Sequence, residues 1–201
     1  MERFELTLDV DSYYSRFDNA YSSAFDQATG ETAYFSSGTS ITKGVEAESN
    51  IMIGGGISVY VNGTAGSAKY ASTGSWVDSA ARDTETVAVN YHDRHWAVGL
   101  FAKRVGRMFN DNGSTHEAVT IDPFTMANLF VNYTLGGSSP FGRSRIRLSV
   151  NNLLDRHHIV GVTPASARTS VPAAGDVLTL MPARSVAVTF AVGFSPERAT
   201  P

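Results

Sequence analysis

Histidines beside acidic residues are the first candidates for metal or acid–base chemistry in this sequence. His92 and His95 flank Asp93 in the run HDRH, and His157 and His158 are adjacent. Imidazole and carboxylate groups bind zinc, but HDRH falls in a predicted short turn that directs only one histidine toward a shared ion. The adjacent histidines open a predicted loop and point apart. We therefore expect solvated turn and loop residues at both places, and no bound metal or other cofactor.

Nucleophile and nucleotide-binding motifs are the next candidates, and the common ones are absent from the sequence. It has no Gly-x-Ser-x-Gly elbow, no His-Glu-x-x-His pair and no Walker loop. The triplet at 54–56 continues into a predicted strand and lacks the spaced third glycine and the helix of a dinucleotide site. No predicted strand carries a His and a Ser two residues apart, as a membrane-embedded lipase would. The sequence does not predict an enzyme.

Polar residues gather at one predicted loop tip. Asn110, Asp111 and Asn112 precede Gly113, and their side chains could hydrogen-bond a ligand such as a sugar or a ferric chelate. The same residue types are what turns select for conformational reasons. These three residues are the candidates for ligand contact, with turn formation as the alternative explanation.

Charged residues recur on the polar sides of predicted strands. Arg145 and Arg147 could attract an anionic ligand, or could pair with Glu46 and Glu48 across a polar interior. We expect the pairing, because charges inside a barrel usually balance one another.

The elements that must position these residues are strands. The run VAVTFAVGF at 186–194 places large apolar side chains at every second position, and side chains alternate faces along a strand. The same alternation marks eight segments, around residues 4–10, 45–53, 57–61, 87–91, 96–103, 128–135, 145–151 and 185–194. No Asp, Glu, Lys or Arg falls on these apolar faces, whereas a charge facing lipid costs about 2–4 kcal/mol near the bilayer midplane. The pattern fits lipid-facing strands, although two packed sheets of a soluble sandwich would alternate similarly.

The connections favour a barrel over a sandwich. Short links, at 54–56, 92–95 and 136–142, alternate with long ones, at 11–39, 70–81, 107–123 and 155–182. Short turns at one end and long loops at the other are typical of outer-membrane barrels. The predicted fold is all-β, an antiparallel up-and-down transmembrane β-barrel.

Two further features fit tall barrel strands. The first two strands are expected to continue past the membrane and to turn at 26–31, where Gly30 can supply a positive φ. Aromatic residues near the short-turn ends mark the expected position of an aromatic girdle, namely Tyr91, Trp96, Tyr133 and Phe194.

Composition agrees with this class. Of 201 residues, 42% are hydrophobic and 17% charged, and no apolar stretch approaches the roughly 20 residues of a spanning helix. A net charge of -3 gives no basic field, so nucleic acid is not an expected partner. With 0 cysteines, disulfides and thiolate metal sites are excluded.

Several stretches resemble the C-terminal half of TonB-dependent outer-membrane receptors. They are KGVEAESNI at 43–51, GLFAKRVGRMFNDNG at 99–113, IDPFTMANLFVNYTL at 121–135, IRLSVNNLLDRHHIVGV at 146–162 and PARSVAVTFAVGF at 182–194. The sequence is most similar to Gram-negative receptors for siderophores and related nutrients. Those receptors carry an N-N-L-F/L-D run before a last strand that ends in an aromatic residue.

This resemblance implies that residues 1–194 form about eight C-terminal strands of a barrel of about 22 strands, with 195–201 as a tail. It also implies a place in the outer membrane of a Gram-negative bacterium, in contact with lipid. Phe190 and Phe194 resemble the signal read by the barrel-assembly machinery. The implied ligand is a small molecule such as a ferric siderophore. The family's plug domain, TonB-contacting segment and signal peptide are not in this sequence, so we expect a fragment that reaches TonB only through a missing N-terminal part.

Two other interpretations remain open. One is a self-contained eight-stranded outer-membrane barrel with a structural or adhesion role, and the other is a soluble carbohydrate-binding β-sandwich. In a larger barrel the first and last strands would pair with strands that this sequence lacks, so in the isolated chain both would expose backbone groups that lipid cannot satisfy. We therefore expect the isolated chain to collect in inclusion bodies and not to transport alone.

Overall fold

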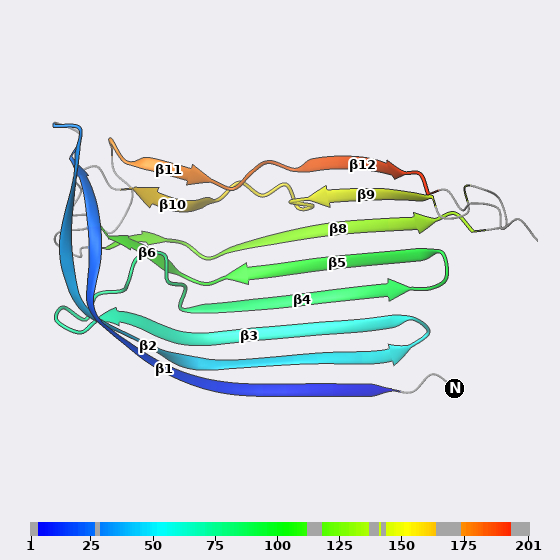
Figure 1. Cartoon of the computed structure of the whole chain (residues 1–201), viewed down its shortest axis with the longest axis horizontal. Helices are drawn as coiled ribbons and strands as arrows, with labels where there is room; N and C mark the ends of the chain where they lie inside the picture. Colours follow the sequence, from blue (N-terminus) through cyan, green and yellow to red (C-terminus); the bar gives the residue numbers. More distant parts are fainter. Residues whose placement is uncertain are drawn as a thin grey trace, which may run out of the picture.

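A single antiparallel sheet of eight strands dominates the computed structural model, which describes residues 4–26, 29–111, 118–136, 141, 144–163 and 174–193 (Figure 1). The strands, in their order across the sheet, are β1 (Glu5–Asp26), β2 (Glu31–Gly54), β3 (Ile57–Tyr70), β4 (Asp83–His92), β5 (Trp96–Val105), β8 (Phe124–Thr134), β9 (Arg145–Asn151) and β12 (Ser185–Ala191). All eight segments predicted from alternation are therefore strands. Within the described ranges, no helix is long and apolar enough to cross a membrane.

One row of apolar side chains crosses the whole sheet. Successive ladder pairs join Leu6, Ile51, Val59, Val89, Leu100, Leu129, Val150 and Val186. Directly opposite residues in a ladder share a face, so this row defines one side of the sheet, which we call the apolar face. The other side, the polar face, carries the next row, made of Thr7, Asn50, Tyr60, Ala88, Phe101 and Asn128. A slip of one residue in any strand would break both rows.

The first two strands form a tall hairpin, 22 and 24 residues long. They pair from Glu5 and Met52 out to Asp26 and Glu31, and Gly30 in the turn has a φ of 72°. Glycine adopts this left-handed conformation at little cost, and the predicted turn at 26–31 is confirmed. The register becomes irregular past Phe17, and the outer part of the hairpin bends away from the direction of the other strands (Figure 1).

Two of the predicted long loops contain short hairpins of their own. β6 (Met108–Asp111) pairs with β7 (Ala118–Ile121), and β10 (Ile159–Thr163) pairs with β11 (Val177–Leu180). The two hairpins contact each other at the long-loop end and enclose a buried core of Met108, Val119, Ile121, Phe124, Val162 and Met181. The expectation of plain loops in these two connections was therefore incomplete. Strands of four or five residues are too short to show period-two alternation clearly.

One carboxylate organises the short turn between β4 and β5. Asp93 Oδ1 accepts hydrogen bonds from the backbone N–H groups of His95 and Trp96, both at 2.7 Å, and Oδ2 accepts one from the Tyr91 hydroxyl at 2.8 Å. The Trp96 and His95 bonds, with help from Tyr91, lower the pKa of Asp93 to about 2. The turn thus depends on the charged form of Asp93.

Glycines on the polar face allow an aromatic ring to lie across neighbouring strands. Tyr13 is the ladder partner of Gly44, and Gly44 is the partner of Gly66. A Cβ added at Gly66 would lie 2.6 Å from the Lys43 carbonyl oxygen and 2.8 Å from the Tyr13 hydroxyl oxygen. Backbone and ring approach too closely for any side chain, which is a recognised reason for glycine inside a strand.

Replacing Gly66 by alanine should destabilise the folded barrel by about 1–3 kcal/mol, the usual cost of overpacking. The Lys43 carbonyl is part of the sheet and cannot withdraw without disturbing the ladder. The measurement is the urea unfolding midpoint, in detergent micelles, of the complete barrel protein that contains this chain. Gly63→Ala on the same strand is the matched control, because its Cβ would meet only the Thr84 carbonyl oxygen, at 3.8 Å. Equal midpoints for the two variants would contradict this account.

Asp93→Ala should weaken the short turn at neutral pH and matter less in acid. A carboxyl group whose pKa is lowered by folding stabilises the fold above its ordinary value of 3.8, and this contribution disappears as the pH falls toward about 2. The unfolding midpoints of wild type and variant should differ at about pH 6 and converge between about pH 4 and about pH 2. Arg94→Ala changes an exposed neighbour in the same turn and should match wild type throughout. A gap that stays constant into acid would show that the charge of Asp93 is not the cause.

Candidate functional site

The apolar face is open to its surroundings. Leu8 is 65% exposed, Val186 63% and Phe190 71%. Contiguous apolar surface on this scale marks contact with another apolar phase or partner. Exposure alone would not distinguish the two sides of a single sheet, but the unbroken apolar row does. This exposed apolar face extends across all eight strands.

Charges appear on the apolar face only toward the long-loop end. In the described parts of β1 to β5, the first charged positions met from the short-turn end are Arg16, Lys43, Lys69, Glu85 and Arg104. Arg104 forms ion pairs with Asp83 at 2.5 Å and with Glu85 at 3.4 Å. The apolar band therefore ends in a charged rim.

Aromatic side chains occupy the short-turn end of the apolar band, opposite the charged rim. Trp96 and Tyr133 are ladder partners whose ring centroids are 4.6 Å apart, and Tyr91 lies on the neighbouring strand β4. Aromatic rings at the edge of an apolar band are typical of a membrane–water interface. These three residues lie where the girdle was expected, whereas Phe194 is outside the described residues.

Hydrogen bonds between neighbouring strands hold the acidic part of the polar face. Glu48 accepts a hydrogen bond from the Tyr60 hydroxyl, and Glu46 accepts one from the Asn62 side chain, both at 2.9 Å. Asp9 lies directly opposite Glu48 in the β1–β2 ladder. Like charges placed opposite each other oppose pairing, so the neutral donors from β3 offset part of this repulsion.

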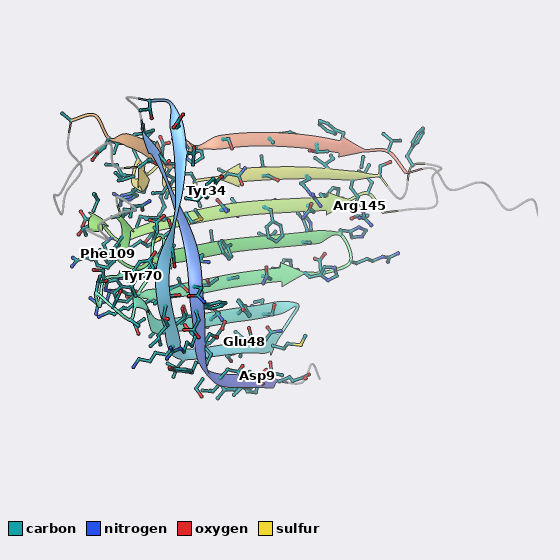
Figure 2. All side chains as sticks on the ribbon, turned by 60° about the vertical axis from the view of Figure 1, so that its left-hand side comes forward. Asp9, Tyr34, Glu48, Tyr70, Phe109 and Arg145 are labelled. Atoms are coloured by element: carbon teal, nitrogen blue, oxygen red, sulfur yellow. The ribbon has the colours of Figure 1, made fainter. Side chains whose placement is uncertain are left out.

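The basic part of the polar face is also satisfied locally. Arg147 donates a hydrogen bond to Asn132 on the adjacent strand at 2.7 Å. The expected pairing of Arg145 and Arg147 with Glu46 and Glu48 is therefore wrong. Strands β3, β4, β5 and β8 separate β2 from β9 in the sheet, and Figure 2 shows Glu48 and Arg145 on strands far apart.

The expected ligand-contact residues lie on β6 and just beyond it. Asn110 and Asp111 end this strand, opposite Val119 and Ala118, while Asn112 lies outside the described residues. Asn110 Oδ1 is buried, and no described residue donates a hydrogen bond to it. A buried unpaired carbonyl oxygen costs free energy, so Asn110 presents an acceptor that still lacks a donor.

An aromatic cluster beside β6 was not expected from the sequence. Trp76 stacks on Phe109 with centroids 5.5 Å apart, and the Lys69 ammonium and the Arg82 guanidinium lie 5.5 and 5.9 Å from the Trp76 ring centroid. Cations over aromatic faces attract the ring electrons. Phe109 and Tyr70 mark the same end of the sheet in Figure 2. Lys69 is at the end of β3, and Trp76 and Arg82 lie in the connection from β3 to β4, whereas Phe109 comes from β6. The contact between these two parts of the chain depends on the fold and could not be read from spacing in the sequence.

The histidines lie in and beside turns. His92 and His157 are exposed, while His95 Nδ1 lies 3.1 Å from the Thr134 carbonyl oxygen and the His158 ring packs beside an aromatic residue of the buried core. Over the described ranges, no group of three or more His, Cys, Asp or Glu side chains could hold a metal ion.

The N-N-L-L-D run ties the end of β9 to the lead-in of β12. Asn152 is 6% exposed, and its Nδ2 donates to the carbonyl oxygens of Arg156 at 2.8 Å and Pro182 at 2.9 Å, while its Oδ1 accepts from the Arg156 N–H at 3.0 Å. Asp155 accepts hydrogen bonds from the Arg184 backbone N–H at 3.1 Å and from its guanidinium at 3.2 Å. We call these contacts the Asn152 clasp. The motif was visible in the sequence, but its contacts were not.

The last strand carries the residues expected to form an assembly signal. Phe190 pairs with Ile146 on the apolar face and is highly exposed. Phe194 lies outside the described residues. The described end of β12 therefore presents one large aromatic side chain on the apolar side.

Solved structures share this fold at low sequence identity. The ferric yersiniabactin uptake receptor FyuA from Yersinia pestis matches with a TM-score of 0.71 and 16% identity, over 94% of this chain and 28% of that chain. The ferric citrate transporter FecA matches with a TM-score of 0.69 and 18% identity, over 93% and 29%. The ferric enterobactin receptor PfeA from Pseudomonas aeruginosa, in a mutant form, matches with a TM-score of 0.65 and 15% identity, over 94% and 29%. The chain thus spans less than a third of the length of these receptors.

The sequence itself also matches a family. No curated protein sequence matches it. The family described as TonB dependent receptor-like, beta-barrel, matches residues 3–153, which is well over half of the chain. Members of this family are outer-membrane transport proteins of Gram-negative bacteria. The chain belongs to the TonB-dependent receptor β-barrel family.

Proposed function

We propose that this chain is part of the barrel wall of an outer-membrane receptor that imports a ferric siderophore or another scarce nutrient. The observation that carries the proposal is the apolar row that continues through all eight strands. A face of this kind suits lipid, and the polar face then lines an enclosed lumen. The charged rim and the aromatic pair at opposite ends of the band suit its two water interfaces.

The sheet does not support the two alternative architectures. A closed eight-stranded barrel would pair β1 with β12, but these strands form the two edges of the sheet. A soluble sandwich would need a second sheet over the apolar face. In the described residues the remaining sheets, β6–β7 and β10–β11, have two strands each and gather at the long-loop end.

Partners follow from the two faces and the last strand. The apolar face would contact outer-membrane lipid, and the barrel-assembly machinery would read the last strand through Phe190 and Phe194. Contact with TonB and gating of the lumen would belong to the N-terminal part of the parent receptor. This segment would therefore not transport a ligand by itself, and its net charge of -3 gives no basic field for nucleic acid.

The ligand would be bound at the long-loop end, where Asn110, Asp111 and Asn112 are proposed to contribute. The Asn110 side-chain oxygen supports this place. No described residue donates a hydrogen bond to it, and a bound ligand would supply the donor. A ferric chelate is the ligand class that fits best, because the solved structures named above are receptors or transporters of ferric yersiniabactin, ferric citrate and ferric enterobactin.

Spin labels should distinguish the two faces directly, because this chain has 0 cysteines of its own. Val59→Cys lies on the apolar face and Ser58→Cys beside it on the polar face. In the full receptor reconstituted in lipid, a nitroxide at position 59 should collide readily with oxygen and poorly with a water-soluble nickel complex. A nitroxide at position 58 should show the opposite preference. If both labels were shielded from both reagents, the apolar face would be packed against protein and the proposal would fail.

The proposed ligand contacts can be tested by uptake. Asn110→Ala combined with Asp111→Ala should lower the apparent affinity for the transported ligand about tenfold, as expected for the loss of two hydrogen bonds. The assay is uptake of radioiron from ferric yersiniabactin, ferric citrate and ferric enterobactin by cells expressing the full receptor at matched outer-membrane levels. Thr120→Ala on the paired strand β7 is the control. Unchanged uptake in the double variant would remove these residues from the site without affecting the lipid-facing assignment.

A further inference from the structure

Two exposed lysines lie close together on the apolar face, at the long-loop end of neighbouring strands. Lys43 is on β2, and Lys69 on β3 is the ladder partner of Ile41, which is two residues from Lys43. Diagonal neighbours of this kind are about 7–8 Å apart, so both lysine side chains can reach the same group. In the described part of the chain, no carboxylate lies within ion-pair distance of either lysine.

The arginines of the charged rim differ from these lysines, because acids of the chain compensate them. Arg16 forms an ion pair with Asp18 at 3.0 Å, and Arg104 forms its pairs with Asp83 and Glu85. The two lysines instead bring like charges together, which is unfavourable. An anion bound between them would remove this repulsion. The charge pattern therefore points to an anionic partner at this place on the apolar face.

The height of the lysines above the short-turn end matches the edge of a lipid bilayer. Ser67, the ladder partner of Lys43, is the tenth residue after Ile57 at the start of β3. Ten residues span about 33 Å along a strand. Because barrel strands tilt by about 35–45°, this distance is about 25 Å along the membrane normal, which is the height of the apolar band of such barrels. The lysine stems can then contact acyl chains while the ammonium groups reach the head groups.

Aromatic residues flank both lysines. Tyr14 is the other ladder partner of Lys43 and is 65% exposed. Trp76 forms a β-bridge with Lys69, and the Lys69 ammonium and the exposed Arg82 guanidinium lie 5.5 and 5.9 Å from its ring centroid. Tyrosine and tryptophan concentrate where a membrane meets water. We call Tyr14, Lys43, Lys69, Trp76 and Arg82 the rim patch.

We propose that the rim patch binds the phosphate head group of an anionic lipid, in the leaflet at the long-loop end, with Lys43 and Lys69 as the phosphate contacts. This inference rests on the proposed function, because it requires the apolar face to contact lipid. A lipid fits better than a soluble anion, since the apolar band begins directly beneath the patch. Val45 and Ala65 form the next ladder row there, both are exposed, and they offer a surface for acyl chains.

Site-directed photo-cross-linking can identify the lipid at the patch. A p-benzoylphenylalanine in place of Ala65 lies on the apolar face, one ladder row nearer the membrane centre than Lys43, where its benzophenone can react with acyl chains. The full receptor is placed in vesicles of equal parts dioleoylphosphatidic acid and dioleoylphosphatidylcholine, which share acyl chains and differ in head-group charge. Mass spectrometry of the cross-linked lipid should show enrichment of phosphatidic acid at position 65. The same residue in place of Val59 should report the composition of the vesicle.

Removing both charges should abolish this selectivity. A lysine near a membrane surface favours anionic lipid by about fivefold, so Lys43→Gln combined with Lys69→Gln should lower the enrichment about thirtyfold. Lys103→Gln is the matched control, because it removes the same charge from the polar face, and it should leave the enrichment intact. Lys43→Arg combined with Lys69→Arg keeps both charges and should keep the enrichment. Loss of enrichment in either of these controls, or its persistence in the glutamine pair, would overturn the proposal.

Further arms of the experiment separate the possible occupants. An excess of glycerol phosphate should not reduce the enrichment, because it lacks acyl chains, whereas full competition would make a soluble phosphate the ligand and overturn the lipid assignment. If position 59 cross-links lipid but position 65 shows no enrichment, the barrel-wall function stands and only the head-group site fails. If neither position cross-links lipid, both proposals fail.

Discussion

Strand register is the constraint on which the rest of this structure depends. Side chains alternate faces with a period of two, so each strand must be aligned correctly for its apolar residues to join the common row. Inner strands are aligned by two neighbours, and the row from Leu6 to Val186 is the result. Within this chain β12 pairs with β9, and the buried Asn152 side chain donates a hydrogen bond to the Pro182 carbonyl just before the start of β12.

The eight strands of the main sheet were predictable because each is at least seven residues long, and alternation over such a length is a strong signal. The turn of the first hairpin was predictable because Gly30 stands where the chain must adopt a positive φ. The hairpins β6–β7 and β10–β11 were not predicted. Their strands are only four or five residues long, and they are stabilised by a core whose members come from distant parts of the chain.

Partners of polar side chains were the least predictable feature. The residue types at Arg147 and Glu48 suggested a mutual ion pair, but each is satisfied by a neutral partner on the adjacent strand. The order of strands in the sheet decides which charged side chains can meet, and that order is known only when the whole topology is known. Asn110 was identified by its type, whereas its burial without a partner depends on the packing around β6. The N-N-L-L-D run was recognisable as a motif, but its reach to Pro182 became evident only from the fold.

The shared core of the two small hairpins has a consequence for how such receptors diversify. Ile121 of one hairpin and Val162 of the other are both almost completely buried in the same cluster. Volume added on one side must be given up on the other, because close-packed interiors leave no spare space. The connections that contain the hairpins β6–β7 and β10–β11 must therefore change together. Transplanting one of them between receptors would carry over only half of a structural unit.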